Sequence, residues 1–271
     1  MKTVLITGSQ GFIGSYLKKS LQDDYYTIGF SRQEGFDISD FQSLKKIDRK
    51  IDIIIHSAAT MSNNFEESFL VNALGTLNIC KYAKKNQVKH LILISSLSIF
   101  DTPDNEYFNN YSKTKKESEL IASSYCEDNN IKLSILRLAQ VYDDQRIAQK
   151  NQQMLYYFID TIKEQSKISL FGKKNPIRNY IHIEYVASVI KEVLQQSKTG
   201  TWNILEEKNH SISEIAYMLF DILKKQPNIT YLQDKANIPS VHIPDTNIYK
   251  STTISPISLY EGLQRILNHD K

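Results

Sequence analysis

The chain reads VLITGSQGFIG over residues 4–14, and this stretch decides the fold. A short apolar run leads into three glycines with the spacing Gly-x-x-Gly-x-x-Gly. Gly8 allows a tight turn, Gly11 lets the backbone approach a pyrophosphate, and Gly14 lets a following helix lie close to the strand. The free N–H groups that open such a helix, with the positive end of its dipole, bind phosphate. The stretch therefore predicts a dinucleotide cradle between a first strand and a first helix.

Beyond the cradle, short apolar runs alternate with amphipathic stretches. The runs are rich in Ile, Val and Leu, which is typical of parallel strands buried on both faces. They are Val4–Thr7, Thr27–Phe30, Ile51–His56, Leu91–Ser95 and Leu133–Leu138, and the helical stretches between them lie near 12–22, 64–86 and 111–128. This order predicts an α/β fold with a Rossmann-type doubly wound parallel sheet over residues 1–140.

The rhythm changes after residue 140. Helices are expected near 150–166, 184–196 and 213–225, with Ser213 as the cap of the last, and strands near 168–171 and 201–205. We expect residues 141–271 to form mainly a small C-terminal substrate-binding domain, with some segments returning to the Rossmann core.

Composition excludes several classes of protein. The 271 residues carry a net charge of +3, from 33 basic and 30 acidic residues that are interleaved, so we expect no nucleic-acid partner. No apolar run approaches the roughly 20 residues of a membrane helix. Cys80 and Cys126 lie far apart with no ligand-like spacing, so no metal site is expected and both thiols should be reduced. These features predict a cytoplasmic protein.

The stretch YSKTK over residues 111–115 places a tyrosine and a lysine four residues apart. On a helix these side chains share a face. An ammonium group near a phenol, together with the positive charge of an oxidised nicotinamide in the cradle, favours the phenolate and lowers the phenol pKa. The spacing therefore favours Tyr111 as a general acid or base, with Lys115 tuning it.

Several motifs occur in one order along the chain: the glycine spacing, HSAA at 56–59, VNALGT at 71–76, the tyrosine and lysine pair, LRL at 136–138 and RNYIHI at 178–183. Together they resemble the extended short-chain dehydrogenase/reductases, also called the NAD-dependent epimerase/dehydratase family. The resemblance covers nearly the whole chain. It implies a catalytic hydroxyl at the end of the fourth strand, which alignment places at Ser96, with Ser95 and Ser98 as competing assignments. It also implies a homodimer formed through the helices near 64–86 and 111–128.

The glycine motif, the resemblance and the end of the second strand together assign the cofactor-binding residues. These are Gly8, Gln10, Gly11, Phe12, Ile13, Gly14, Ser31, Arg32, Asp37, Ile38, Ser57, Ala58, Ala59, Asn72 and Lys115. NAD enzymes usually place an acid at the end of the second strand for the ribose 2′-hydroxyl, but here Phe30 is followed by Ser31 and Arg32. Both can bind a 2′-phosphate, so NADP(H) is favoured and NAD(H) remains the alternative.

Members of the family mostly act on nucleotide-linked sugars, and the resemblance assigns Thr60, Gln140 and Arg178 to such a substrate. Dehydratases of the family carry Asp-Glu after the catalytic hydroxyl, where this chain has Leu97 and Ser98. We therefore expect an NADP(H)-dependent reductase of a keto group on a nucleotide-activated sugar, such as a 4-keto-6-deoxy sugar. The alternatives are a nucleotide-sugar 4-epimerase with tightly bound NAD and a non-catalytic dinucleotide-binding module.

Overall fold

The computed structural model describes residues 1–251 and 253–269. Its centre is a parallel sheet in the order β10-β5-β4-β3-β1-β2. The order reverses between β1 and β3, the place where doubly wound sheets bind ligands at the carboxyl ends of their strands. The strands are β1 (Thr3–Thr7), β2 (Tyr26–Phe30), β3 (Ile53–His56), β4 (His90–Ser96), β5 (Lys132–Leu138) and β10 (Gly200–Ile204). The predicted Rossmann-type α/β fold is confirmed.

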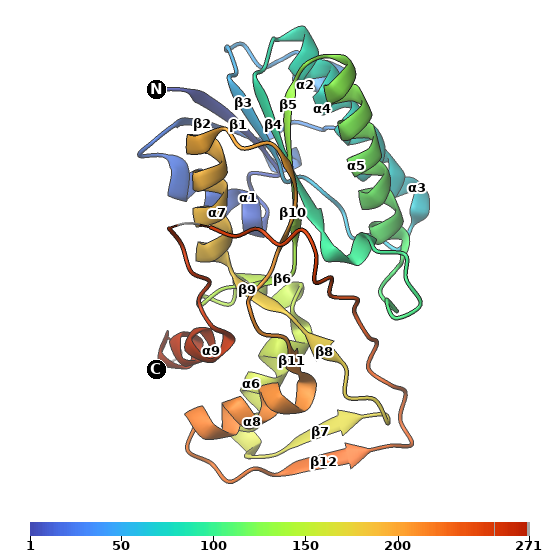
Figure 1. The fold of residues 1–271 in the computed structure, drawn as a ribbon, viewed down its shortest axis with the longest axis vertical. Coiled ribbons are helices and arrows are strands. Elements are labelled where there is room, and N and C mark those ends of the chain that lie inside the picture. Colours follow the sequence, from blue (N-terminus) through green and yellow to red (C-terminus); the bar gives the residue numbers. More distant parts are fainter. Residues whose placement is uncertain (252, 270–271) are drawn as a thin grey trace.

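Helices cover both faces of this sheet (Figure 1). On one face, α1 (Phe12–Leu21) packs beside α7 (Ile183–Gln196), and their apolar residues share a core with β1 and β3. On the other face lie α4 (Gly75–Lys85) and α5 (Asn110–Asp128), with the short α2 (Phe41–Leu44) against α4. The inner strands β1, β3 and β4 are therefore buried on both sides, as their continuous apolar runs predict, while the edge strands β2 and β10 are partly exposed.

The single helix expected near 64–86 is wrong in detail. The segment divides into α3 (Phe65–Ser68), a π-helical turn η2 (Phe69–Leu74) and α4. The backbone carbonyl of Asn72, inside the π turn, accepts hydrogen bonds from the hydroxyls of Thr76 (2.6 Å) and Ser118 (2.8 Å). Because π turns are rare and gather at functional sites, this turn draws attention to Asn72.

The C-terminal part packs three helices around a second apolar core. These are α6 (Gln153–Gln165), α8 (Ile212–Ile222) and α9 (Leu259–His269). Three two-stranded sheets accompany them: β6 (Gln140–Tyr142) with β9 (Tyr180–His182), β7 (Ile168–Phe171) with β12 (Ile229–Leu232), and β8 (Ile177–Arg178) with β11 (His210–Ser211). The short 3-10 helices are η1 (Arg32–Glu34), η3 (Leu97–Ile99) and η4 (Ile147–Lys150).

Ser213 does not cap α8, contrary to expectation. Ser211 does so: its hydroxyl accepts from the Glu214 N–H (3.2 Å), while the Glu214 carboxylate accepts from the Ser211 N–H (2.7 Å). This capping box starts the helix two residues earlier than the apolar pattern suggested.

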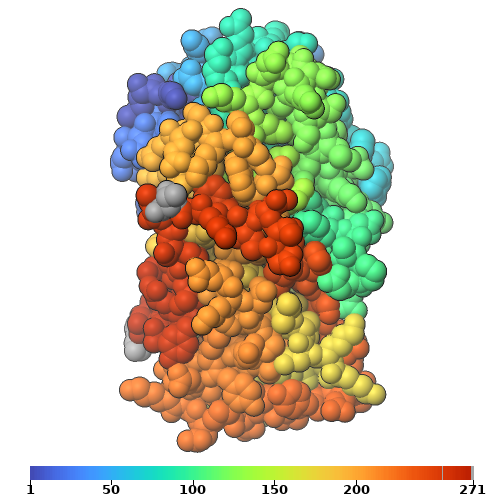
Figure 2. All heavy atoms as spheres, in the orientation of Figure 1, coloured from blue at the N-terminus to red at the C-terminus, as the bar shows by residue number. Residues whose placement is uncertain are grey.

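Two parts of the second half return to the central sheet. β10 pairs with β5 and α7 packs on α1, although both follow residue 141. The chain after β12 also runs back across the front of the molecule and passes the loop that precedes α5 (Figures 1 and 2). The division at residue 140 stays a prediction. In the described part of the chain, no helix is both long and apolar enough to span a membrane.

Candidate active site

The glycine loop forms a cradle in which backbone meets backbone. Gly8 has φ +69°, and a Cβ on it would lie 2.8 Å from the Ala58 Cα atom. A Cβ on Gly14 would lie 2.2 Å from the Gly8 carbonyl oxygen, whereas one on Gly11 meets only that oxygen, at 3.2 Å. The turn therefore needs glycine at its first and third positions to bring α1 against β1 and β3. Its shape fits the pyrophosphate of a dinucleotide.

A cavity of about 240 Å³ opens over this cradle, between the ends of β1, β2 and β3. Ten residues assigned to the cofactor from sequence line it: Gly8, Gln10, Gly11, Ser31, Arg32, Asp37, Ile38, Ser57, Ala58 and Ala59. Phe12, Ile13, Gly14, Asn72 and Lys115 do not line it, and their role toward the cofactor stays a prediction. Phe30, Gln33, Phe36 and Val71 line the cavity too, although none of them was assigned to the cofactor from the sequence.

The structure places an acid near the end of β2, where the sequence lacked one. Glu34 lies at the end of η1, and its carboxylate turns back under the glycine loop. It accepts hydrogen bonds from Ser9 Oγ (2.5 Å), Ser31 Oγ (2.9 Å) and Gln10 Nε2 (3.2 Å), and Lys18 Nζ lies 3.4 Å away. Sequence reasoning missed Glu34 because it examined only the residues directly after Phe30.

A directed chain of hydrogen bonds runs through the core behind the cradle. The Thr76 hydroxyl donates to the Asn72 carbonyl, so it accepts from His56 Nε2 (3.0 Å). His56 Nδ1 is then left to accept from the Thr7 hydroxyl (2.7 Å), which itself accepts from the Ala58 N–H. Burial, with a smaller effect of the Lys115 charge, lowers the pKa of His56 to about 3. This neutral histidine ties β1 and β3 to the π turn.

Asn72 holds the active-site helix in place. Its side-chain oxygen accepts from the Thr60 N–H (2.8 Å), and its amide nitrogen donates to the Thr60 carbonyl (3.0 Å) and the Thr114 hydroxyl (2.9 Å). Both amide protons are therefore committed within the protein. The residue links the segment after β3, which includes the substrate candidate Thr60, to α5.

The structure brings Ser96, Tyr111 and Lys115 together. Asn109 caps α5 by accepting from the Ser112 N–H (3.2 Å), which places Tyr111 and Lys115 in its first turns. Ser96 ends β4, and its hydroxyl lies near enough to the Tyr111 phenol to lower the pKa of that phenol. Lys115 is buried and donates to the Ile94 carbonyl (2.7 Å).

The two competing residues, Ser95 and Ser98, have no such effect on the pKa of Tyr111. Ser95 points into the interior, where its hydroxyl has no hydrogen-bond partner among the described residues. Ser98 contacts the Ser96 hydroxyl (3.0 Å). The geometry thus favours Ser96.

The pKa values of Tyr111 and Lys115 describe the protein without its cofactor. Burial raises the pKa of Tyr111 to about 12, against a smaller lowering effect of the nearby Ser96 hydroxyl. Burial also lowers the pKa of Lys115 to about 8, although Glu119 acts the other way. Because the phenol is removed from water, the neighbouring lysine alone does not lower its pKa. A further positive charge is needed for that.

On the substrate side, Arg178 is almost fully buried. Its guanidinium donates to the carbonyls of Ile177 (2.8 Å) and Pro239 (2.7 Å) and lies over the Tyr107 ring, 5.6 Å from its centre. Gln140 donates to the Gln152 side-chain oxygen (3.3 Å). The expected binding of a substrate phosphate by Arg178 stays a prediction, and that phosphate would have to displace carbonyl partners.

Two segments that are far apart in sequence close over Arg178. We call residues 101–109, before α5, the front loop and residues 237–242, after β12, the return segment. Glu106 joins them: its N–H donates to the Ser240 carbonyl (3.0 Å), and its carboxylate accepts from the Ser240 N–H (2.5 Å) and from Lys174 Nζ (2.7 Å). Asp104 pairs with His242 Nδ1 at 2.9 Å. Figure 2 shows the return segment crossing the surface beside the front loop.

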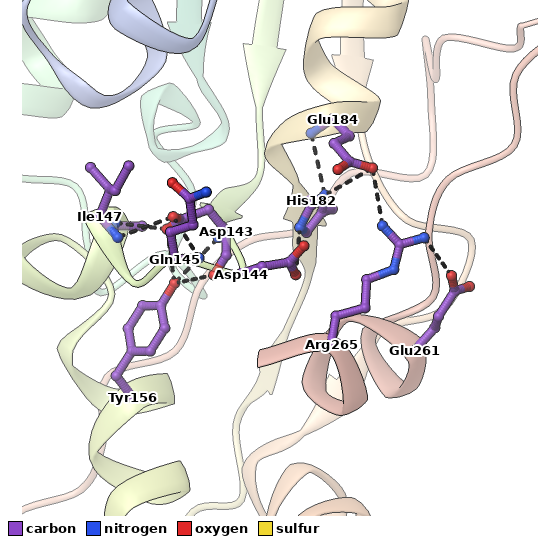
Figure 3. Close-up of polar contacts among 10 residues, drawn as sticks. Asp143, Asp144, Gln145, Ile147, Tyr156, His182, Glu184, Glu261 and Arg265 are labelled. Atoms are coloured by element: carbon purple, nitrogen blue, oxygen red, sulfur yellow. Dashed lines mark hydrogen bonds and ion pairs between the residues drawn. The ribbon is translucent and has the colours of Figure 1, made fainter. Parts of the chain in front are cut away.

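His182 has a structural role at the junction (Figure 3). Its Nδ1 accepts from the Glu184 N–H at the start of α7 (3.3 Å), so its Nε2 donates to Asp144 (3.1 Å). Arg265 of α9 then bridges the Glu184 carboxylate (3.0 Å) and Glu261 (2.7 Å). This network joins α7 to α9. No group of three or more potential ligands that could hold a metal occurs in the described residues.

Known proteins share this architecture. The sequence profile of the NAD dependent epimerase/dehydratase family matches residues 4–204. The UDP-glucuronate 4-epimerase of Thermodesulfobacterium geofontis (strain OPF15) is 29% identical, over 94% of this chain and 81% of its own length.

Two solved structures match the fold over almost the whole chain. A UDP-N-acetylglucosamine 4-epimerase from Methanobrevibacter ruminantium M1, in complex with UDP-N-acetylmuramic acid, has a TM-score of 0.80 at 20% identity and covers 99% of this chain and 98% of its own. A dTDP-4-dehydrorhamnose reductase from Bacillus anthracis str. Ames, in complex with NADP, has a TM-score of 0.76 at 21% identity and covers 99% of both chains. Since epimerase and reductase share this fold, the fold does not separate their reactions. The family profile, spanning most of the chain, establishes that it belongs to the NAD-dependent epimerase/dehydratase family.

Proposed function

We propose that the chain is a nucleotide-sugar 4-epimerase that keeps NAD bound, with Ser96, Tyr111 and Lys115 as its catalytic residues. The observation that carries the proposal is the placement of the three side chains at the sheet edge that also holds the glycine cradle: Ser96 ends β4, and Tyr111 and Lys115 lie in the first turns of α5. The 29% identity to a UDP-glucuronate 4-epimerase supports epimerisation over the keto reduction expected first.

The chemistry divides between cofactor and protein. NAD, when bound, would supply the acceptor and donor of the hydride exchanged at the C4 carbon of the sugar. Tyr111, as phenolate, accepts the proton of the C4 hydroxyl while a C4 carbonyl forms, and gives it back when the carbonyl is reduced on its other face. Ser96 holds that oxygen by a hydrogen bond. Lys115, with the positive charge of the oxidised nicotinamide, offsets the burial that raises the pKa of Tyr111.

One of the two observations that favoured a reductase over an epimerase no longer holds. These were the missing dehydratase pair, which also suits an epimerase, and a missing acid at the end of β2. Glu34 supplies a carboxylate there, hydrogen-bonded to Ser31. We therefore hold NAD, rather than NADP, to be the working cofactor. A nucleotide sugar is the proposed substrate, with Thr60, Gln140 and Arg178 on its side of the cleft.

The test is a product assay. The purified protein is incubated with UDP-glucuronate, and the configuration at C4 is followed by NMR while absorbance at the NADH band is recorded. We expect interconversion without net change in the cofactor. The Tyr111→Phe variant should bind the dinucleotide normally and lose about 10²- to 10⁴-fold in turnover. Stoichiometric consumption of NADH or NADPH with a 4-keto sugar nucleotide would instead identify a reductase.

We also propose that the chain forms a homodimer through α4 and α5. An apolar groove between these helices is lined by Leu77, Leu120, Ile121 and Tyr125, and Leu120 is 59% exposed. A second copy of the same helix pair would cover it with an isologous surface. Light scattering on the purified protein should give twice the 31.3 kDa mass of one chain, and a monomer at micromolar concentration would contradict this.

A further inference from the structure

The hydroxyl of Ser31 has its single proton committed. Ser31 lines the cradle cavity at the end of β2, where dinucleotide-binding folds place the ribose of the adenosine. Its Oγ donates to Glu34 Oε2 (2.9 Å) and accepts from the Glu34 N–H (3.3 Å). A serine hydroxyl has one proton and two lone pairs, so what Ser31 has left for a ligand is one lone pair. It can accept a hydrogen bond and cannot donate one.

We propose that Glu34 sets the cofactor preference of this chain by holding Ser31 as an acceptor, so that the cradle binds a ribose 2′-hydroxyl and rejects a 2′-phosphate. A 2′-hydroxyl has a proton to give to Ser31. A 2′-phosphate has only acceptor oxygens and carries about two negative charges at neutral pH, so it meets a lone pair where it needs a donor. Glu34 is a positioning residue, since it acts through Ser31.

The charge of Glu34 is secured by the same contacts. Its carboxylate is partly buried, which opposes ionisation, but hydrogen bonds from Ser9, Ser31 and Gln10 outweigh burial and leave its pKa below the ordinary value. The donors occupy both carboxylate oxygens. The Glu34 carboxylate next to Ser31 is therefore negatively charged at neutral pH. It repels a 2′-phosphate, and it also keeps the Ser31 hydroxyl proton engaged in a hydrogen bond.

Two cationic side chains lie close to the Glu34 carboxylate or line the cavity. Lys18 Nζ lies 3.4 Å from the Glu34 carboxylate, and Arg32 lines the cavity as an exposed side chain. Without Glu34, both cations would be free to attract a 2′-phosphate, and the freed Ser31 hydroxyl could donate to it. This explains why the sequence at 31–32 resembles an NADP site while the folded site opposes NADP.

The inference rests on the dinucleotide part of the proposed function and not on the epimerisation. NADH and NADPH are titrated separately into wild type, Glu34→Gln and Glu164→Gln, by calorimetry and after removal of copurified nucleotide. Glu164→Gln is the matched control, because it removes one negative charge from an exposed position on α6, in the other half of the molecule. We expect wild type and control to bind NADH at least tenfold more tightly than NADPH. Glu34→Gln should reduce this ratio at least tenfold, mainly through tighter NADPH binding.

Two further variants separate hydrogen bonding from charge and guard against misfolding. Glu34→Asp keeps the charge but is too short to hold Ser31, so the ratio should fall partway. Ser31→Ala removes the acceptor and should weaken NADH several-fold with little change for NADPH. Raising salt from 0.1 to 1 M screens the charge and should reduce the wild-type ratio only in part, because the hydrogen-bond mismatch persists.

A wild type that binds NADPH as tightly as NADH overturns the proposal. So does a folded Glu34→Gln whose ratio stays within twofold of wild type, or, should that variant not fold, a Glu34→Asp and Ser31→Ala pair with unchanged ratios. A chain that reduced keto sugars with NADH would end the epimerase proposal and leave this one standing. An active epimerase whose ratio of NADH to NADPH affinity did not change on substitution of Glu34 would end this proposal and leave the epimerase proposal standing.

Discussion

The two sides of the cleft are held in different ways. On the cofactor side, glycine backbone packs against backbone, and a buried chain through His56 fixes β1, β3 and the π turn. On the substrate side, the side-chain contacts of the front loop are mostly exposed: Asp104, which pairs with His242 of the return segment, is 63% exposed, and Lys174, which pairs with Glu106, is 47% exposed. A backbone bond from Glu106 to Ser240 and a bond from the buried Arg178 to Pro239 add to them. Exposed ion pairs contribute little, because water and salt screen them. The cofactor side is thus preformed, while the substrate side can open at low cost.

The largest effect is expected from breaking the preformed side. Gly14→Ala places a Cβ 2.2 Å from the Gly8 carbonyl oxygen, and since backbone does not yield as a side chain does, α1 must move away from β1. We expect a loss of about 3 kcal/mol in the free energy of unfolding and at least a hundredfold loss of NADH affinity, measured by urea unfolding and calorimetry.

Gly11→Ala is the matched control for this substitution. Its Cβ would meet only the Gly8 carbonyl oxygen, at 3.2 Å, so the fold should tolerate it while the cradle becomes narrower. Wild-type stability is expected together with weaker binding. Equal stabilities for the two variants would show that the close approach of α1 to β1 is not what holds this side rigid.

A second, smaller effect concerns the buried charge on the preformed side. Burial lowers the pKa of Lys115 to about 8 from an ordinary 10.5, so the charged form is disfavoured in the folded protein. Lys115→Met should therefore raise the free energy of unfolding of the cofactor-free protein at pH 7 by about 2 kcal/mol, the lost bond to Ile94 included.

The lowered pKa of Lys115 also predicts how the free energy of unfolding of the wild type changes with pH. Between pH 8 and 10.5 the unfolded wild type holds a proton on Lys115 that the folded protein has released, so wild-type stability should rise with pH across this window relative to the variant. Stability differences that stay flat from pH 7 to 10.5 would mean that the ammonium is not desolvated as the structure indicates.

The sequence indicates geometry best where the candidate residues are close together in the chain. The glycine loop spans seven residues from Gly8 to Gly14, and Tyr111 and Lys115 share one helix face, so their spacing alone indicates their geometry. Placing Ser96 needed the family resemblance, because the contact with Tyr111 joins β4 to α5. Short sequence patterns indicate the geometry within one element well. They indicate contacts between elements only through resemblance to a known family.

Contacts that depend on distant elements have no recognisable pattern in the sequence. Glu34 reaches Ser9 only because a 3-10 turn reverses the chain after β2, a turn that no apolar period marks. Asp104 and His242 are 138 residues apart, and neither belongs to a motif. The π turn at Asn72 depends on hydroxyls supplied by two helices. Such features follow from tertiary packing, which a periodic pattern does not encode.

The smallest effect is expected on the substrate side of the cleft, where the front loop and the return segment meet. Asp104→Asn keeps a hydrogen-bond acceptor for His242 but removes the charge, so the return segment should exchange its amide hydrogens several-fold faster while the cradle is unchanged. The substrate KM should change by no more than about threefold, since an exposed pair contributes little. Asp101→Asn, an exposed acid in the same loop, is the control.

Acid should have the same effect on the wild type. The hydrogen bond that Asp104 accepts from His242 holds the pKa of its carboxyl below the ordinary value. The contact is therefore complete above the ordinary pKa of 3.8 and is lost as the pH falls through the lower, folded value. Protection of residues 237–242 should decline in that acidic window in wild type and not in Asp104→Asn. If both lose protection equally, Glu106, with its bonds to Ser240 and Lys174, holds the two segments together and Asp104 does not.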